Sequence, residues 1–178
     1  MIARQVFNQI NFALKPFNDE FGFARSGSIS NGFYRQNGSG AILLYWVQFD
    51  RYGFDSHFGS RFTIEIQIGN EDKLSSNLFK GRKRAYQLLG VENVEKLKLH
   101  NQFVVDSINS LKIPEDHIYW QMPVEVRESM IPHNNYLYNQ RDDRWVLYRD
   151  ALSVSNAVTL SVAFIHEIMR NIINLNEL

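Results

Sequence analysis

Residues 33–69 constrain the fold more than any other part of the chain, because they read as three strands in succession. The stretches 33–36, 41–49 and 61–68 are rich in aromatic and β-branched residues. A short polar turn at residues 37–40 joins the first two strands, and a longer aromatic loop joins the last two. Strands in this order are typical of an antiparallel meander.

The third of these strands alternates between apolar and polar residues. One side carries Phe62, Ile64, Ile66 and Ile68, and the other carries Thr63, Glu65 and Gln67. This alternation predicts a half-buried strand whose polar side faces solvent. Residues 41–49 are apolar on both sides, which predicts a central strand covered on each face, or one covered by helices on one face and by a partner on the other.

Helical periodicity appears at both ends of the chain. An apolar stripe predicts a first helix over residues 2–17, with Pro16 marking its end or a bend. A last helix is predicted to start near Ser153 or Ser155 and to be more buried than the first. Between them we expect helix within residues 73–89 and 93–111, a strand at 118–126, and a hairpin that pairs 136–138 with 145–148.

These elements predict one α+β domain over residues 1–178. We expect an antiparallel sheet of about four to six strands, with the N-terminal and C-terminal helices packed on one face. The covered face should be the one that carries the isoleucines of residues 61–68.

Composition and charge exclude several classes of function. The chain has no cysteine, which rules out disulfides, thiolate zinc sites and cysteine nucleophiles. The 19 basic residues balance the 19 acidic ones, whereas general nucleic-acid binding usually needs a basic excess. Residues 1–5 lack the apolar core of a signal peptide, and the apolar C-terminal window is interrupted by His166, Glu167 and Arg170. We therefore expect a cytoplasmic protein that spans no membrane.

The order of the first elements resembles a known bacterial family. In order, the chain has a helix, a Gly-Phe pair, an aromatic strand, an apolar strand and a strand that alternates between polar and apolar residues. The positions that match the family pattern are Gly22, Phe23, Phe33, Tyr34, Arg35, Gln48, Phe62, Thr63 and Gly69. Residues 144–150, followed by a helix, are similar in character. The chain resembles the family catalogued as domain of unknown function 4304, mainly over residues 1–70. The resemblance implies an α+β fold and no established activity, cofactor or catalytic residue.

One pattern is typical of a metal-dependent nuclease. Glu65 and Gln67 leave their strand on the same side, and Asp50 or Asp55 precedes them in the loop. Restriction-endonuclease-like enzymes hold Mg²⁺ for phosphodiester hydrolysis with an aspartate followed by a Glu-x-Lys pair. Here Gln67 stands in place of the lysine, and no proline precedes the aspartate. The structural alternative is that Glu65 and Gln67 belong to a solvent-facing strand surface.

The histidines do not form a metal-binding motif in the sequence. A zinc-protease helix needs two histidines four residues apart, and here Arg170 stands four residues after His166. The remaining histidines, His57, His100, His117 and His133, lack metal-ligand spacing. The sequence therefore predicts no metal site and no cofactor.

Two stretches are candidates for binding. The loop of residues 50–60 carries rings and glycines that suit a binding loop, with Tyr52, Phe54, His57 and Phe58 as its candidate contacts. The alternative is a loop folded over the sheet edge that buries Phe54 and Phe58. A basic cluster of Lys80, Arg82, Lys83 and Arg84 could meet phosphate or an acidic protein surface, or form an exposed turn and helix start.

The function that these observations favour is a non-enzymatic protein-interaction or immunity-type module of the bacterial cytosol. Net neutrality, a high aromatic content and the lack of an intact catalytic motif motivate this hypothesis. The alternatives are the metal-dependent nuclease or phosphodiesterase built on Asp50 or Asp55, Glu65 and Gln67, and a small-ligand sensor with a pocket between sheet and helices.

Overall fold

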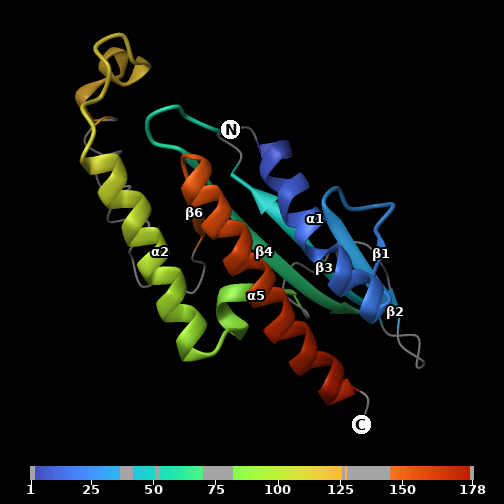
Figure 1. The fold of residues 1–178 in the computed structure, drawn as a ribbon. Coiled ribbons are helices and arrows are strands. Elements are labelled where there is room, and N and C mark those ends of the chain that lie inside the picture. Colours follow the sequence, from blue (N-terminus) through green and yellow to red (C-terminus); the bar gives the residue numbers. More distant parts are fainter. Residues whose placement is uncertain are drawn as a thin grey trace.

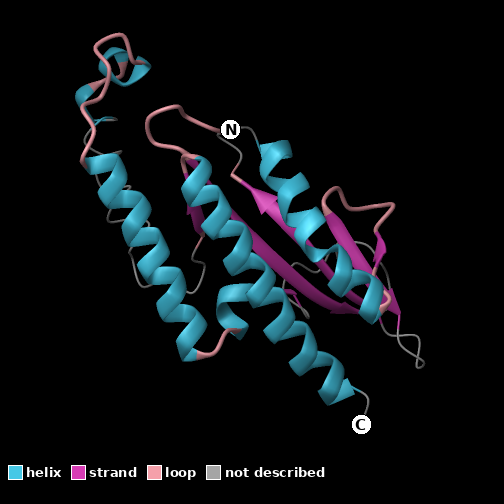
Figure 2. Cartoon of the chain, viewed as in Figure 1, coloured by secondary structure: helices cyan, strands magenta, loops and turns pink. Residues whose placement is uncertain are grey.

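In a computed structural model of the chain, long helices cover one side of an antiparallel sheet (Figure 1; Figure 2). The structure describes residues 3–36, 42–50, 53–69, 82–125, 127 and 145–176. The elements in chain order are α1 (Ala3–Phe21), β1 (Ala24–Arg25), β2 (Gly32–Gln36), β3 (Ile42–Phe49), β4 (Ser60–Gly69), β5 (Arg82–Arg84), the 3-10 helix η1 (Ala85–Leu88), α2 (Val91–Asn109), the 3-10 helix η2 (Ile118–Gln121), β6 (Val146–Tyr148) and α5 (Ala151–Asn176).

The sheet has six strands, and its order confirms the predicted antiparallel meander. Strands β1 to β5 follow one another in sequence order, and β6 also pairs with β4. In the central pair, Tyr45 of β3 lies opposite Ile66 of β4, and Trp46 lies opposite Glu65. β5 pairs with the second half of β4, while β6 pairs with its first half. β4 therefore pairs with three other strands of the sheet, β3, β5 and β6.

Helices α1 and α5 pack against each other and against one face of the sheet, which confirms the predicted α+β arrangement (Figure 1). The core between these layers includes Ile10 and Phe17 of α1, Phe164 and Ile165 of α5, and Ile64 of β4. α1 continues through Pro16 to Phe21, so the predicted end at residue 17 is wrong. The buried stripe of α1 extends through Leu14, Phe17 and Asn18, and this packing holds the helix on both sides of the proline.

Helix α2 lies beside α5 and closes the outer edge of β6 with its side chains. Asn101 accepts a hydrogen bond from the backbone N–H of Leu147 (3.1 Å) and donates one to the carbonyl of Trp145 (2.8 Å). His100 donates from Nε2 to the carbonyl of Leu147 (2.7 Å). A free strand edge invites pairing with another chain, so these contacts remove that edge from solvent.

Both faces of β4 are buried, which corrects one expectation. Ile64 and Ile66 lie in the core as predicted, but Glu65 and Gln67 on the opposite face are only 2% and 4% exposed. Ile68, predicted to point inward, is 43% exposed near the end of the strand. The polar side of β4 is therefore not a solvent-facing surface.

Two local predictions also differ from the structure, and a third is tested only in part. Residues 82–84 form strand β5 rather than helix, because Arg82 and Arg84 pair with the buried side of β4. Residues 118–121 form the 3-10 helix η2 rather than a strand. Residues 146–148 are a strand, as predicted, and pair with β4; their predicted pairing with residues 136–138 lies outside the described residues and stays a prediction.

One helix in the described part of the chain, over Ala151–Ile173, is long and apolar enough to cross a membrane by length and composition alone. The core helix of a soluble protein passes the same test, and Val154, Phe164 and Ile168 of this helix are buried within the chain. The length and composition of this helix are weak evidence for a membrane span, and the expectation that the chain contacts no membrane stays a prediction.

Candidate functional site

The buried carboxylate of Glu65 is the centre of a charged cluster on the sheet face away from α1 and α5. Arg82 donates from Nε to one carboxylate oxygen (2.9 Å), and Arg84 donates from Nε to the other (3.1 Å). Gln48 accepts a further hydrogen bond from Arg82 Nη2 (3.3 Å). The side chain of Glu65 is 3% exposed, so two guanidinium groups compensate a charge that water does not reach.

Tryptophan rings and a second ion pair extend this cluster along the sheet. The guanidinium of Arg82 lies 5.1 Å from the centre of the Trp46 ring. Arg84 and Arg61 lie 5.2 Å and 5.0 Å from the centre of the Trp145 ring. Arg61 also donates from Nε to a carboxylate oxygen of Asp50 (2.5 Å). Stacking on aromatic faces orients a guanidinium and adds to the ion pairs.

The residues of the nuclease hypothesis have different partners in the structure. Glu65 pairs with two arginines, Asp50 pairs with Arg61, and Gln67 lies opposite Arg82 in the β4–β5 register. Among the residues that the structure describes, no group of three or more histidine, aspartate or glutamate side chains could hold a metal ion. The nuclease alternative and the ligand-sensor alternative stay predictions.

The loop before β4 folds back on itself around Asp55. The backbone of Asp55 exchanges hydrogen bonds with Gly59 (2.9 and 2.8 Å). The carboxylate of Asp55 accepts from the N–H groups of His57 and Phe58 (both 2.8 Å). An aspartate that bonds the backbone two and three residues ahead is typical of a tight Asx turn.

The rings of this loop pack inward. Phe54 stacks on Tyr148 of β6 at 6.1 Å between ring centres, and Phe58 packs with the apolar side chains of α2 and with Leu147. His57 is 5% exposed. These positions agree with a loop folded over the sheet edge, and the role of these residues in binding stays a prediction. Tyr52 and Lys80 lie outside the described residues, and Lys83 is exposed on β5.

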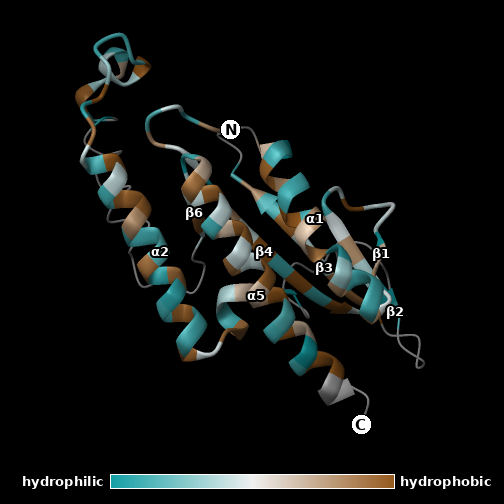
Figure 3. Cartoon of the chain, viewed as in Figure 1, coloured by the Kyte–Doolittle hydropathy of each residue, from teal (hydrophilic) through white to brown (hydrophobic). Residues whose placement is uncertain are grey.

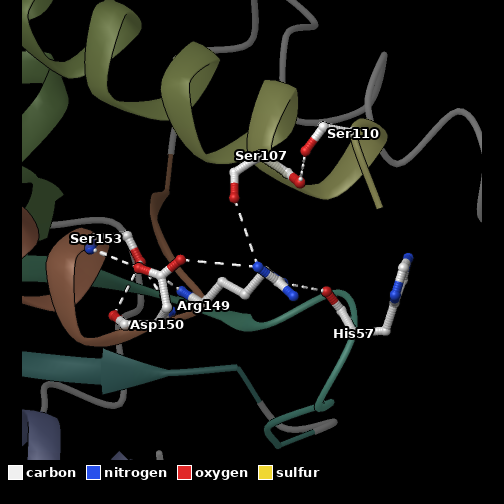
Figure 4. A network of polar contacts seen from close by, with 6 residues as sticks. All are labelled: His57, Ser107, Ser110, Arg149, Asp150 and Ser153. Carbon is white, nitrogen blue, oxygen red and sulfur yellow. Dashed lines mark hydrogen bonds and ion pairs between the residues drawn. The ribbon is translucent and has the colours of Figure 1, made fainter. Parts of the chain in front are cut away.

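Arg149, in the connection between β6 and α5, ties this loop to α2 (Figure 4). Its Nε donates to the carbonyl of His57 (2.6 Å), and its Nη1 donates to Ser107 Oγ (3.5 Å). The same guanidinium lies 3.7 Å from a carboxylate oxygen of Asp150. Ser153 Oγ accepts from the backbone N–H groups of Arg149 and Asp150 (both 2.9 Å), so the start of α5 is held in the same network.

Asp55 also reaches His117, at the start of η2. His117 Nε2 lies 3.3 Å and 3.2 Å from the two carboxylate oxygens. The other ring nitrogen, Nδ1, accepts the backbone N–H of Tyr119 (3.1 Å). An aspartate and a histidine activate a nucleophile only if the second ring nitrogen is free to take its proton. Both nitrogens of His117 are engaged, so this pair is arranged for holding rather than for proton transfer.

The segment after α2 protrudes from the rest of the chain (Figure 1), and hydrophobic and hydrophilic residues alternate along its ribbon (Figure 3). We call residues 111–125 the protruding segment. Its large exposed side chains are Leu111 (43% exposed), Ile118 (58%), Trp120 (46%) and Val124 (51%). The sequence did not single out this segment, because its short apolar run fits a strand as well as an exposed turn.

Contacts within the protruding segment and with Arg127 fold it into a turn. Trp120 donates from its ring N–H to the carbonyl of Pro114 (2.9 Å), and the backbone N–H of His117 bonds the same carbonyl (3.0 Å). Arg127 lies over the rings of Tyr119 and Trp120, at 5.9 and 5.8 Å. The exposed apolar side chains are therefore presented by a hydrogen-bonded turn.

Comparison of this chain with protein-family models, with curated proteins and with solved structures gives no match. The resemblance of residues 1–70 to the domain of unknown function 4304 family stays a prediction.

Proposed function

We propose that this chain is a protein-interaction module of the bacterial cytosol that acts without catalysis, and that the protruding segment is part of its contact surface. The observation that carries the proposal is the exposure of Leu111, Ile118, Trp120 and Val124 on one short, protruding stretch. An immunity-type role is a narrower form of the same proposal.

The chemistry of the segment suits a protein partner. Large apolar side chains gathered on a surface are costly in water, and such patches in soluble proteins commonly mark sites of interaction. Tryptophan is enriched among the residues that dominate binding energy. The hydrogen bond between Trp120 and the carbonyl of Pro114 positions the ring before any partner arrives. Binding by a preformed surface loses less conformational entropy than binding by a loose one.

The test compares partner capture by three forms of the chain. The tagged wild type, an Ile118→Ser and Trp120→Ala double variant, and a Phe12→Ser control are incubated with bacterial lysate. Phe12 lies on α1 and is 82% exposed, so the control removes an exposed ring from a different element. We expect proteins that the wild type and the control retain to be lost from the double variant.

The thermal unfolding of all three forms checks that the variants remain folded. All three side chains lie outside the hydrophobic core, so the melting temperatures should agree closely apart from the small local loss of the hydrogen bond between Trp120 and the Pro114 carbonyl. Identical capture by all three forms, or no capture above background, would contradict the proposal.

A further inference from the structure

Arg127, directly after the protruding segment, is a half-buried cation without a carboxylate partner among the described residues. Its guanidinium lies over the rings of Tyr119 and Trp120, at 5.9 and 5.8 Å from the ring centres. Its Nε has no hydrogen-bond acceptor in the described part of the chain. Aromatic faces orient a guanidinium but carry no negative charge that neutralises it. The cation therefore favours a carboxylate from outside the chain.

Glu125, two residues earlier, has the opposite requirement. Its side chain is exposed and forms no ion pair within the described ranges of the chain. The backbone N–H of Arg127 donates to the carbonyl of Pro123 (3.0 Å), so Glu125 and Arg127 belong to one helical turn. Side chains two positions apart on a helix do not face each other. The two charges of one copy are therefore presented on different sides of this turn.

This arrangement is complementary to itself under two-fold symmetry. In a two-fold contact, a residue of one copy that meets a second residue of the other copy is matched by the reverse contact. An axis that passes between Glu125 and Arg127 places each guanidinium opposite the carboxylate of the other copy. The 19 basic and 19 acidic residues of the chain balance, so two copies approach without long-range repulsion.

We propose that a second copy of this chain covers the protruding segment, in a two-fold dimer in which Arg127 of each copy binds Glu125 of the other. The exposed side chains of Ile118, Trp120 and Val124 supply the apolar part of the contact. The second copy is favoured over an unrelated protein because this surface itself carries both of the charges that it leaves without a partner. The inference rests on the proposed function, because it names the occupant of the proposed contact surface.

The mass of the purified full chain in solution tests the dimer. Sedimentation equilibrium is measured from about 1 μM to about 300 μM, which covers dissociation constants in the micromolar range. We expect the average mass of the wild type to rise from that of one chain to that of two. The Ile118→Ser and Trp120→Ala double variant should stay monomeric over the same range.

Exchanging the two charges assigns the contact to Arg127 and Glu125. Arg127→Glu and Glu125→Arg should each weaken association at least about tenfold, because like charges then oppose each other twice in the dimer. An equal mixture of the two variants should associate again, because every contact in the mixed dimer joins opposite charges. Misfolding would not be repaired by mixing. Arg25→Glu, which removes a cation over the ring of Phe7, is the control and should associate like the wild type.

The possible failures of the dimer and of the proposed function are distinguishable. A wild type that is monomeric throughout, or a mixture that does not associate, would overturn the dimer. So would a dimer that survives the loss of the Ile118 and Trp120 side chains, because its contact would lie elsewhere. If a monomeric wild type still captures lysate proteins through these side chains, another protein occupies the surface and only the dimer is overturned.

Discussion

Glu65 of β4 and Arg84 of β5 lie opposite each other in the strand register, and the guanidinium Nε donates to the carboxylate at 3.1 Å. Arg82 holds the other oxygen at 2.9 Å. The buried carboxylate of Glu65 therefore joins β4 to β5 through Arg82 and Arg84, in addition to the backbone hydrogen bonds between the two strands.

Glu65→Ala should destabilise the fold because it leaves two guanidinium groups without their counterion. Removing one partner from a buried pair costs about 3 to 5 kcal/mol. The arginines are 21% and 25% exposed, so water offsets part of this cost, and we expect a loss of about 2 to 3 kcal/mol. Urea unfolding measures the change. Glu115→Ala, which removes an exposed partner of Lys112, should leave stability nearly unchanged, and equal losses in both variants would contradict this reading of β4.

Gly59 and Gly53 provide a matched pair for testing how closely the loop packs on β6. Both have positive φ, +77° and +80°, so alanine at either position costs about 1 to 2 kcal/mol for the backbone alone. A Cβ at Gly53 would meet nothing within 4 Å. At Gly59 it would overlap the carbonyl of Tyr148 and lie 2.9 Å from Arg149 Cα. Gly59→Ala should therefore lower the unfolding free energy by about 3 kcal/mol or more, clearly beyond Gly53→Ala.

Glu167 of α5 caps the N-terminus of α2. Its carboxylate accepts the backbone N–H of Gly90 (2.9 Å) and the side-chain amide of Asn93. Gly90 has no side chain to cap the helix, so Glu167→Ala should cost about 1 kcal/mol. Glu167→Gln keeps an acceptor and should recover about half of that loss, the rest being the charge at the helix N-terminus. Denaturation midpoints of the two variants that do not differ would show that the cap contributes nothing.

We expect the burial of the His100 ring to make the fold less stable in acid. Burial lowers its pKa below the ordinary value of 6.5, and its hydrogen bond to the Leu147 carbonyl opposes this shift without reversing it. The folded state then binds fewer protons than the unfolded state, so this contribution is complete above about pH 6.5 and declines as the pH falls below it. The unfolding free energy of wild type should fall more steeply between about pH 7 and pH 5 than that of His100→Gln. Parallel slopes would exclude His100 as a source of acid sensitivity.

The sequence was sufficient for much of the architecture. The apolar stripes predicted the helices at both ends, and residues 33–69 predicted the order of the central strands. The alternation around Ile64 and Ile66 correctly identified the face that α1 and α5 cover. These predictions succeed because local periodicity follows directly from the geometry of helices and strands.

The candidate site was much less predictable. The sequence places Glu65 on the polar side of its strand, but the partners that bury it, Arg82 and Arg84, come from a segment that reads as helix. His117 lies 62 residues from Asp55, and Arg149 lies 92 residues from His57. Histidine spacing along the chain carries no signal for such contacts.

Taken by itself, the sequence determined which stretches bury an apolar face, because that depends on residues within one turn or one strand. The tertiary structure decided what meets the opposite face of β4 and which rings surround His57. Those outcomes depend on the pairing of distant segments, where the cost of burying a charge is offset only by a partner brought from elsewhere in the chain. The exposure of the protruding segment was also decided by the tertiary structure, because whether a side chain meets solvent depends on how the whole chain folds.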